Sequence, residues 1–227
     1  ASSAHTLGVV GGGQLGRMLA EAAAPLGVDV VVLDPTPSCP ASRVADQIEA
    51  DFDDTDAITE LASRVDALTV EIELADPNAL EAAKAEHDVA VHPDPDTLRT
   101  IRDKLVQTRA FDDAGVPLPE YRAVDDADEL RDAVSAFGSV MLKARTGGYD
   151  GRGNVPVGPD DDVEARLAEI GIGSVEGGGD EGMSAAESDR GAVAEAFVDF
   201  ERELSVIGVK GDGEIRTYPA TETIHED

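Results

Sequence analysis

Two glycine-rich stretches contain the residues best suited to binding anions. The first, Gly11 to Met18 (GGGQLGRM), lies between an apolar run and a helix-like run, and Gly11, Gly13 and Gly16 spell G-x-G-x-x-G. Glycine lets the backbone bring its N–H groups close to an anion, and a helix N-terminus favours negative charge. Asp34 ends the next apolar run, close to where a Rossmann enzyme keeps its ribose-binding acid. By pattern alone, this stretch indicates an NAD site.

The second stretch covers residues 140–154 and reads VMLKARTGGYDGRGN. Lys143 lies in a strand-like run, two residues before Arg145. The loop that follows holds four glycines, with Asp150 and Arg152 between them. Free backbone N–H groups beside basic side chains, in an acidic chain, indicate an anionic ligand such as a nucleoside triphosphate. It is not a Walker loop because the G-K-[ST] ending is missing, and a glycine hairpin with incidental charge is the alternative.

The composition restricts the possible partners. The chain has 227 residues, 41% of them apolar, enough to bury a core as one large domain or two modest ones. Its 48 acidic and 18 basic residues give a net charge of −30, which repels nucleic acid and anionic membranes. The acids are scattered and only four lysines occur. This pattern is typical of proteins from salt-loving cells, and an ordinary acidic protein is the alternative.

Cysteine use and hydropathy indicate a cytoplasmic protein. Cys39 is the only cysteine, which excludes an internal disulfide and a cysteine metal cluster. The sequence has no signal-peptide pattern and no apolar run long enough to cross a bilayer. It begins without Met and ends in ETIHED, directly after a strand-like run. We therefore expect the chain to be the N-terminal part of a longer protein.

The elements that must position the first loop follow from hydrophobic periodicity. Three Val/Leu-rich runs have the length of buried strands: residues 7–10, 28–33 and 67–70. Ala/Leu-rich stretches with helical spacing lie between them: residues 14–24 and 57–65. The alternation continues through residues 79–86 and 89–91. It predicts βαβ units around a parallel sheet, that is, a Rossmann-like α/β domain.

A domain boundary is expected at His92-Pro93-Asp94-Pro95, because two prolines break helix and interior strand alike. The predicted domains are residues 1–95 and 96–227. In the second domain we expect one helix over residues 96–114 and a strand over 139–144. Further strand-like runs follow at residues 192–197, 203–209 and 217–225. Residues 173–191 are rich in Gly, Ser and acids, which predicts a mobile surface segment.

Motifs along the chain resemble, in order, those of one family. GGGQLGRM (11–18), LDPTPSCPASRVAD (33–46) and TVEIEL (69–74) are similar to its opening loop, second-strand segment and T-x-E-x-E strand. IRDKLVQTRAFDDAGVPLP (101–119) and KARTGGYDGRGN (143–154) resemble its helix–turn segment and its most specific loop. The family is that of the N5-carboxyaminoimidazole ribonucleotide synthetases, ATP-grasp enzymes of purine synthesis. The resemblance covers nearly the whole chain and implies that the second domain is an incomplete α+β ATP-grasp domain.

The resemblance implies an ATP site between two lobes. Lys104 and Lys143 would contact the phosphates, and Glu203 would accept hydrogen bonds from the ribose hydroxyls. The phosphates would be covered by a loop of seven residues: Gly148, Tyr149, Asp150, Gly151, Arg152, Gly153 and Asn154. The adenine would meet a hinge of four residues: Glu195, Ala196, Phe197 and Val198. His225 falls on a nucleotide-side position, and Thr223 stands where the family usually has Asn.

The implied reaction is a two-step carboxylation. Bicarbonate attacks the γ-phosphate of ATP to give carboxyphosphate, and the amine of 5-aminoimidazole ribonucleotide then captures the carboxyl group, directly or as CO₂. Three residues would face this chemistry, with Arg152 stabilising the anionic intermediate: Tyr149, Asp150 and Arg152. The ribonucleotide phosphate, rather than NAD, would lie at the first loop, nearest Gly13, Gln14 and Leu15. Asp34 is then a turn residue at a strand end.

The resemblance also implies a contact with the aminoimidazole, a metal ion and a partner chain. Glu73 would bind the aminoimidazole, with Glu71 the weaker candidate. Mg²⁺ would accompany ATP, but no residue of the chain can be assigned as its ligand, and we expect the ligands beyond residue 227. A homodimer is implied as well.

Three other functions remain as alternatives. An NAD-dependent dehydrogenase is supported by the first loop and Asp34, but it leaves Lys104 and Lys143 unexplained. A related ATP-grasp ligase, such as the formate-dependent glycinamide ribonucleotide transformylase, shares the opening loop but not TGGYDGRG. A catalytically inactive acidic binding module is the third.

Overall fold

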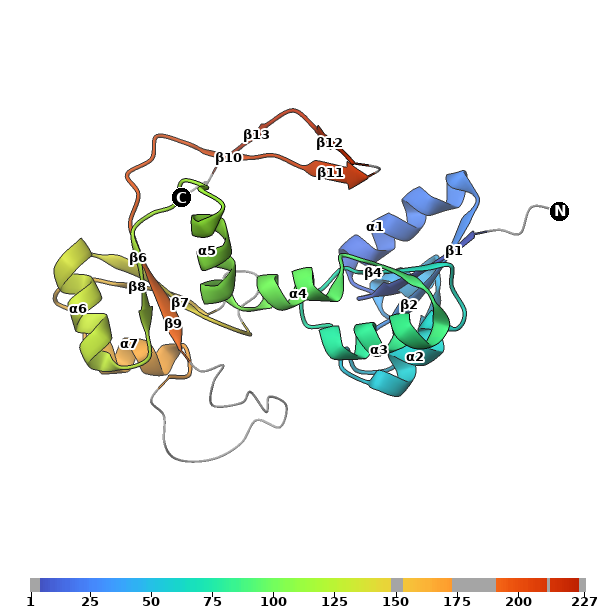
Figure 1. Ribbon diagram of the computed structural model, residues 1–227, viewed down its shortest axis with the longest axis horizontal. Helices are drawn as coiled ribbons and strands as arrows, with labels where there is room; N and C mark the ends of the chain where they lie inside the picture. The colour runs from blue at the N-terminus through green and yellow to red at the C-terminus, as the bar shows by residue number, and fades with distance from the viewer. Residues whose placement is uncertain (1–4, 148–152, 173–190, 212, 225–227) are drawn as a thin grey trace.

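A computed structural model of the chain describes residues 5–147, 153–172, 191–211 and 213–224 (Figure 1). Two groups of elements follow one another along the chain. The first is built on a parallel sheet and the second on an antiparallel sheet. This order agrees with the predicted fold class, an α/β unit followed by an α+β unit.

The first group is a five-stranded sheet in the order β3-β2-β1-β4-β5. All four strand pairings are parallel. The strands are β1 (His5–Val10), β2 (Val28–Leu33), β3 (Asp46–Ile48), β4 (Ala67–Val70) and β5 (Ala90–His92). Continuous apolar runs are expected in such a sheet because helices cover both faces.

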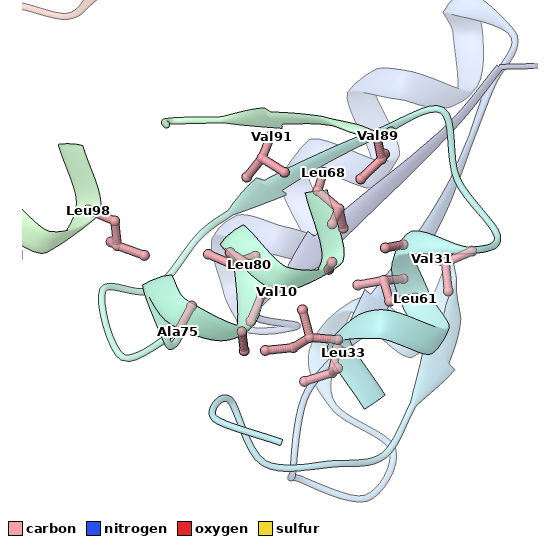
Figure 2. Close-up of a cluster of buried hydrophobic side chains, with 14 residues drawn as sticks. Val10, Val31, Leu33, Leu61, Leu68, Ala75, Leu80, Val89, Val91 and Leu98 are labelled. Atoms are coloured by element: carbon pink, nitrogen blue, oxygen red, sulfur yellow. The ribbon is translucent and has the colours of Figure 1, made fainter. Parts of the chain in front are cut away.

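Successive residues of β1 and β2 face opposite sides of the sheet. On one side, Val9 and Val32 pack against Ala20 of helix α1. On the other, Val10 and Leu33 pack in a larger core that includes residues from α2 and α3 (Figure 2). The elements that cover the sheet are α1 (Gln14–Ala23), the 3₁₀ turns η1 (Ala24–Leu26) and η2 (Pro40–Arg43), α2 (Thr55–Ala62) and α3 (Pro77–His87). The sheet is therefore covered on both faces, as the alternation predicts.

The expected single helix over residues 96–114 is two helices, so this prediction is wrong in detail. Helix α4 (Pro95–Arg102) ends before Asp103, and α5 (Lys104–Asp113) begins after it. Asp103 has extended backbone angles, φ −110° and ψ 111°. Its side chain accepts from Leu105 N–H and Val106 N–H and so forms the N-cap of α5. The capping bond replaces the helical bonds that a continuous helix would make.

Aspartate forms the N-cap of six helices in succession, α2 to α7. In each, a carboxylate oxygen accepts from a backbone N–H of the first turn. The capping residues are Asp54, Asp76, Asp94, Asp103, Asp126 and Asp162. A carboxylate at this end also interacts favourably with the helix dipole, so part of the acidic excess has a structural use.

The second group contains a four-stranded antiparallel sheet in the order β6-β9-β7-β8. Its strands are β6 (Tyr121–Val124), β7 (Val140–Ala144), β8 (Asn154–Val157) and β9 (Ala192–Ala196). Helices α6 (Ala127–Phe137) and α7 (Val163–Glu169) pack on one face, where Val140 and Leu142 of β7 are fully buried. The strands predicted at 139–144 and 192–197 are thus confirmed as β7 and β9, whereas β6, α6, β8 and α7 were not predicted.

The last part of the chain forms two short strand pairs. Strand β10 (Glu203–Ser205) pairs with β13 (Thr221–Thr223), and β11 (Gly208–Gly211) pairs with β12 (Glu214–Thr217), both antiparallel. The single strand expected over 203–209 is therefore divided into two. Every described residue from 197 to 224 is exposed, and ten large apolar side chains are among them, Phe200, Ile207 and Ile215 included.

The length and apolar character of a helix decide whether it can span a membrane. Among the helices of the described residues, none combines the length and the apolar character needed to span a bilayer.

Candidate functional site

The first glycine loop joins β1 to α1 at the carboxyl end of the parallel strands. Gly11 N–H donates to Leu33 O at 2.9 Å, and Gly12 O accepts from Ala41 N–H at 2.9 Å. Gly13 is the N-cap residue of α1 and can offer no side-chain cap. The first N–H groups of α1 thus lack a capping side chain, an arrangement suited to binding an anion. Gln14 and Leu15, the first two residues of α1, are exposed.

Asp34 serves this loop as a structural residue. Its side chain is buried, and its two oxygens accept from Gly12 N–H and Thr36 N–H, each at 2.8 Å. An acid that binds a ribose diol needs those oxygens free and accessible. The geometry therefore favours the turn role that was expected for Asp34 and weighs against the NAD alternative.

The acidic residue beside this loop is Glu71. Strand β4 ends at Val70, opposite Val10 of β1, so Glu71 follows directly at the same edge of the sheet. A methyl group built on Gly11 would lie 2.6 Å from Glu71 Oε2, which shows how closely the carboxylate approaches the loop. Glu73 is half-buried in the turn that follows β4. The strand end at Val70 is the sequence signal that distinguishes Glu71, because parallel strands bring their carboxyl ends to one edge.

The close packing of the loop makes Gly16 hard to replace. A methyl group on Gly16 would lie 2.6 Å from Gly11 O, a backbone atom, whereas one on Gly13 would come no nearer than 3.6 Å to Glu71 Oε2. We expect Gly16→Ala to lower the free energy of unfolding by about 2–3 kcal/mol, although alanine is the better helix former. Urea unfolding of the Gly16→Ala variant and of wild type measures this loss of stability. Gly13→Ala is the matched control, and equal losses in the two variants would contradict the clash as the cause.

A second set of candidate residues gathers on the antiparallel sheet. Met141 and Lys143 lie on the side of β7 opposite the helix-covered core, and Arg145 is the first residue after the strand. Lys143 Nζ lies 2.5 Å from Glu195 Oε2 of the neighbouring strand β9, and both side chains are largely buried. Lys104, the first residue of α5, donates its N–H to Arg145 O at 2.8 Å. The backbone at the start of α5 therefore meets the chain two residues beyond Lys143.

The Glu195 carboxylate was assigned to the hinge, and the structure gives it a salt bridge with Lys143. Ala196, the last residue of β9, donates its N–H to Glu120 O at 2.8 Å. Phe197 and Val198 follow and are exposed. Glu203 lies on β10 directly opposite Thr223 of β13, so the two residues are cross-strand neighbours. No sequence signal had indicated that pairing.

The covering loop lies mostly outside the described residues. Gly148, Tyr149, Asp150, Gly151 and Arg152 are among those not described, and so is His225. The loop ends at Gly153, whose carbonyl accepts from Ala144 N–H at 2.8 Å. Asn154 begins β8 and pairs with Lys143 in the sheet register. The second end of the loop is therefore attached to β7.

Asp103 and Arg145 form a salt bridge next to these lysines. Arg145 Nε donates to both carboxylate oxygens at 3.1 Å, and its Nη2 also donates to Oδ2. The side chains are only 14% and 18% exposed. Burial acts to raise the pKa of Asp103, but hydrogen bonds from Arg145 and Val106 N–H outweigh it and hold the pKa below its ordinary value. The pair thus contributes stability above the unfolded-state pKa of about 4, which is lost as the pH falls through the folded-state pKa.

No metal site is visible in the part of the chain that the structure describes. Within it, no three His, Cys, Asp or Glu side chains are grouped so as to hold a metal ion.

An open parallel sheet with a glycine loop at its carboxyl edge is typical of nucleotide-binding α/β proteins, and the half-buried Lys143 on the antiparallel sheet adds a cation suited to an anionic ligand. Two family models identify the kind of nucleotide-binding domains that the chain contains. Residues 4–102 match the ribonucleotide synthetase preATP-grasp domain, and residues 109–227 match the ATP-grasp domain. The chain belongs to the ATP-grasp family.

Individual relatives and solved structures show which members of this family the chain is similar to. The chain is 36% identical over 222 residues to the N5-carboxyaminoimidazole ribonucleotide synthase of Pseudomonas aeruginosa, covering 97% of this chain and 56% of that protein. The carboxyaminoimidazole ribonucleotide synthase of Aspergillus clavatus, solved with ATP, is similar at 34% identity and a TM-score of 0.84, over 98% of this chain and 55% of the other. The Aspergillus enzyme solved with ADP and 5-aminoimidazole ribonucleotide gives 33% identity and a TM-score of 0.81, over 99% and 55%. The chain thus spans little more than half the length of each of these proteins.

Proposed function

We propose that the chain belongs to an enzyme that carboxylates 5-aminoimidazole ribonucleotide to N5-carboxyaminoimidazole ribonucleotide in purine biosynthesis, using ATP and bicarbonate. The observation that carries this proposal is the likeness, over 99% of the chain, to a structure that holds ADP and 5-aminoimidazole ribonucleotide. The glycine loop at α1 and the lysines near β7 give the chain one candidate anion site in each of its two groups of elements. A reaction in which ATP activates bicarbonate for capture by the amine of a ribonucleotide needs two such sites, one for each nucleotide.

In this proposal, Lys104 and Lys143 bind the ATP phosphates. Their role is electrostatic: fixed cations stabilise the charge that develops on the transferred phosphoryl group. Glu195 keeps the Lys143 ammonium group in place through the 2.5 Å salt bridge. The hinge from Glu195 to Val198 meets adenine, and Glu203 binds the ribose. Gly148 to Asn154 close over the phosphates, and Tyr149, Asp150 and Arg152 act at the carboxylation step, with His225 on the nucleotide side.

The ribonucleotide is assigned to the first loop. Its 5′-phosphate would accept hydrogen bonds at the N-terminus of α1, from Gly13, Gln14 and Leu15. Glu73 is the residue that the family resemblance implies for binding the aminoimidazole. Glu71, which approaches Gly11 of the same loop, remains the weaker candidate for the aminoimidazole.

The accompanying ion is proposed to be Mg²⁺, which would neutralise phosphate charge when bound with ATP. The described residues offer it no cluster of ligands, so we assign none and derive no step through it. We also propose a division between the domains at residues 95 and 96, and a homodimer in the cytoplasm.

The acidic excess supports a further proposal, that the protein works at high intracellular salt. With 48 acids and 18 bases, at least 30 acids are without a basic partner even if every base pairs with a different acid. The six aspartate caps use only a few of these. Concentrated salt screens the repulsion among the remainder.

The proposed function is tested by substrate-stimulated ATP hydrolysis. The full-length protein, in buffered bicarbonate and MgCl₂, should release ADP faster when 5-aminoimidazole ribonucleotide is added. Glycinamide ribonucleotide with formate should have no such effect. Stimulation by glycinamide ribonucleotide instead would favour the related transformylase, and tight binding of NADH would support the dehydrogenase.

A further inference from the structure

We infer that the Asp103–Arg145 salt bridge positions Lys104 and Lys143 so that both ammonium groups meet the same polyphosphate. This rests on the ATP site proposed above and adds two residues that do not themselves contact the nucleotide. Asp103 adjoins Lys104, and Arg145 follows Lys143 by two residues. The salt bridge thus links the two segments that carry the lysines.

Asp103 sets the start of α5. Its Oδ1 accepts from Leu105 N–H at 2.9 Å and from Val106 N–H at 3.2 Å. The same carboxylate receives the Arg145 guanidinium. One side chain therefore fixes the first turn of α5, which includes Lys104, and ties that turn to β7.

Arg145 sets the end of β7. Its N–H donates to Gly191 O at 3.0 Å, and its carbonyl accepts from Lys104 N–H at 2.8 Å. Lys143 of β7 and Arg145, the first residue after it, each pair with an acid from a different element, Glu195 of β9 and Asp103 before α5. The backbone contact and the salt bridge act on the same two segments, so α5 cannot turn relative to β7 without breaking both.

The geometry calls for arginine at position 145. A guanidinium can donate through Nε and Nη2 at once, as it does here, whereas a lysine ammonium is a single point of charge. Because both side chains are largely buried, solvent and salt screen the interaction little. Arg145→Lys keeps the positive charge but removes the paired Nε and Nη2 donors. Asp103→Asn keeps a good N-cap but removes the negative charge.

The test compares three ligands of the full-length protein by titration calorimetry: ATP, inorganic tripolyphosphate and adenosine. We expect Arg145→Lys and Asp103→Asn each to bind ATP and tripolyphosphate about tenfold more weakly, because misplaced cations lose electrostatic contact. Adenosine binding should stay within about twofold of wild type, which a general loss of structure would not allow. The double variant should be no weaker than the weaker single variant, because both changes break one pair.

The control is Arg131→Lys, which alters the Arg131–Glu164 salt bridge on the exposed surface of α6 and α7. It should leave all three affinities unchanged. Unchanged ATP binding in both test variants would overturn the inference, and so would equal losses for ATP and adenosine. If the wild-type protein binds ATP but the ribonucleotide does not stimulate hydrolysis, the substrate assignment fails while the positioning role stands. If it binds neither ATP nor tripolyphosphate, both proposals are overturned.

Discussion

Replacing Lys143 by methionine is expected to weaken ATP binding by the full-length protein at least about a hundredfold, or about 2.7 kcal/mol. Methionine keeps the length of the side chain and removes the charge. The effect should exceed that of losing one phosphate contact, because Glu195 is left without the cation that lies 2.5 Å from it in the structure. An unpaired, largely buried carboxylate would then repel the phosphates.

This mechanism can be separated from a simple loss of charge. Adding Glu195→Gln to Lys143→Met removes the unpaired acid and should restore about tenfold of the lost affinity. Lys84→Met is the matched control, because Lys84 also pairs with an acid, Asp94 at 2.7 Å, but on the exposed surface of the first group. Equilibrium dialysis with labelled ATP measures all four proteins. ATP binding by Lys143→Met within threefold of wild type would refute the role of Lys143.

Raising the KCl concentration from 0.1 M to 2 M is expected to stabilise the protein strongly. The Debye length falls from about 10 Å to below 3 Å over this range, so repulsion among exposed carboxylates nearly vanishes. If each of the 30 uncompensated acids contributes about 0.1 kcal/mol, the gain is about 3 kcal/mol. For a chain of this size that corresponds to a rise in Tm of about 10 °C, measurable by calorimetry.

A charge-reduced variant distinguishes screening from a general effect of salt. Four exposed acids outside the helix caps can be changed to amides: Glu49→Gln, Asp53→Asn, Asp160→Asn and Asp199→Asn. The variant should have a higher Tm than wild type in 0.1 M KCl and the same Tm in 2 M KCl. An equal rise with salt in both proteins would show that charge repulsion is not the cause.

The parallel sheet was predictable because each of its main strands is a continuous apolar run, and burial on both faces needs nothing else. The break between α4 and α5 was not. Leu98, Ile101 and Leu105 keep helical spacing across Asp103, and only the competition between a capping bond and a helical bond ends the first helix there. Asp103 also has a partner 42 residues away, and a contact at that distance has no local sequence signal.

The candidate site, like the fold, has a part that residue types indicate and a part that depends on tertiary structure. Residue types alone indicated the two glycine-rich loops and Lys143 as candidates for binding an anion, whereas Lys104 was proposed from the family resemblance. What depended on tertiary structure was the pairing of charges: Lys143 with Glu195, and Asp34 with the N–H groups of Gly12 and Thr36. A motif names the residues that can meet a ligand, but strand register decides which acid lies beside them, as the approach of Glu71 to the first loop shows.

The six aspartate caps have a consequence for redesign. A version of this protein intended for dilute buffer would need fewer acids, and the sequence alone gives no order in which to remove them. The structure shows which acids to keep, because six of them are the N-caps of helices: Asp54, Asp76, Asp94, Asp103, Asp126 and Asp162. Neutralising the acids at random would fray helices while relieving repulsion, and the two effects would oppose each other. Sparing these six positions, together with Asp34 and Glu195, keeps the acids to which the structure gives a defined partner.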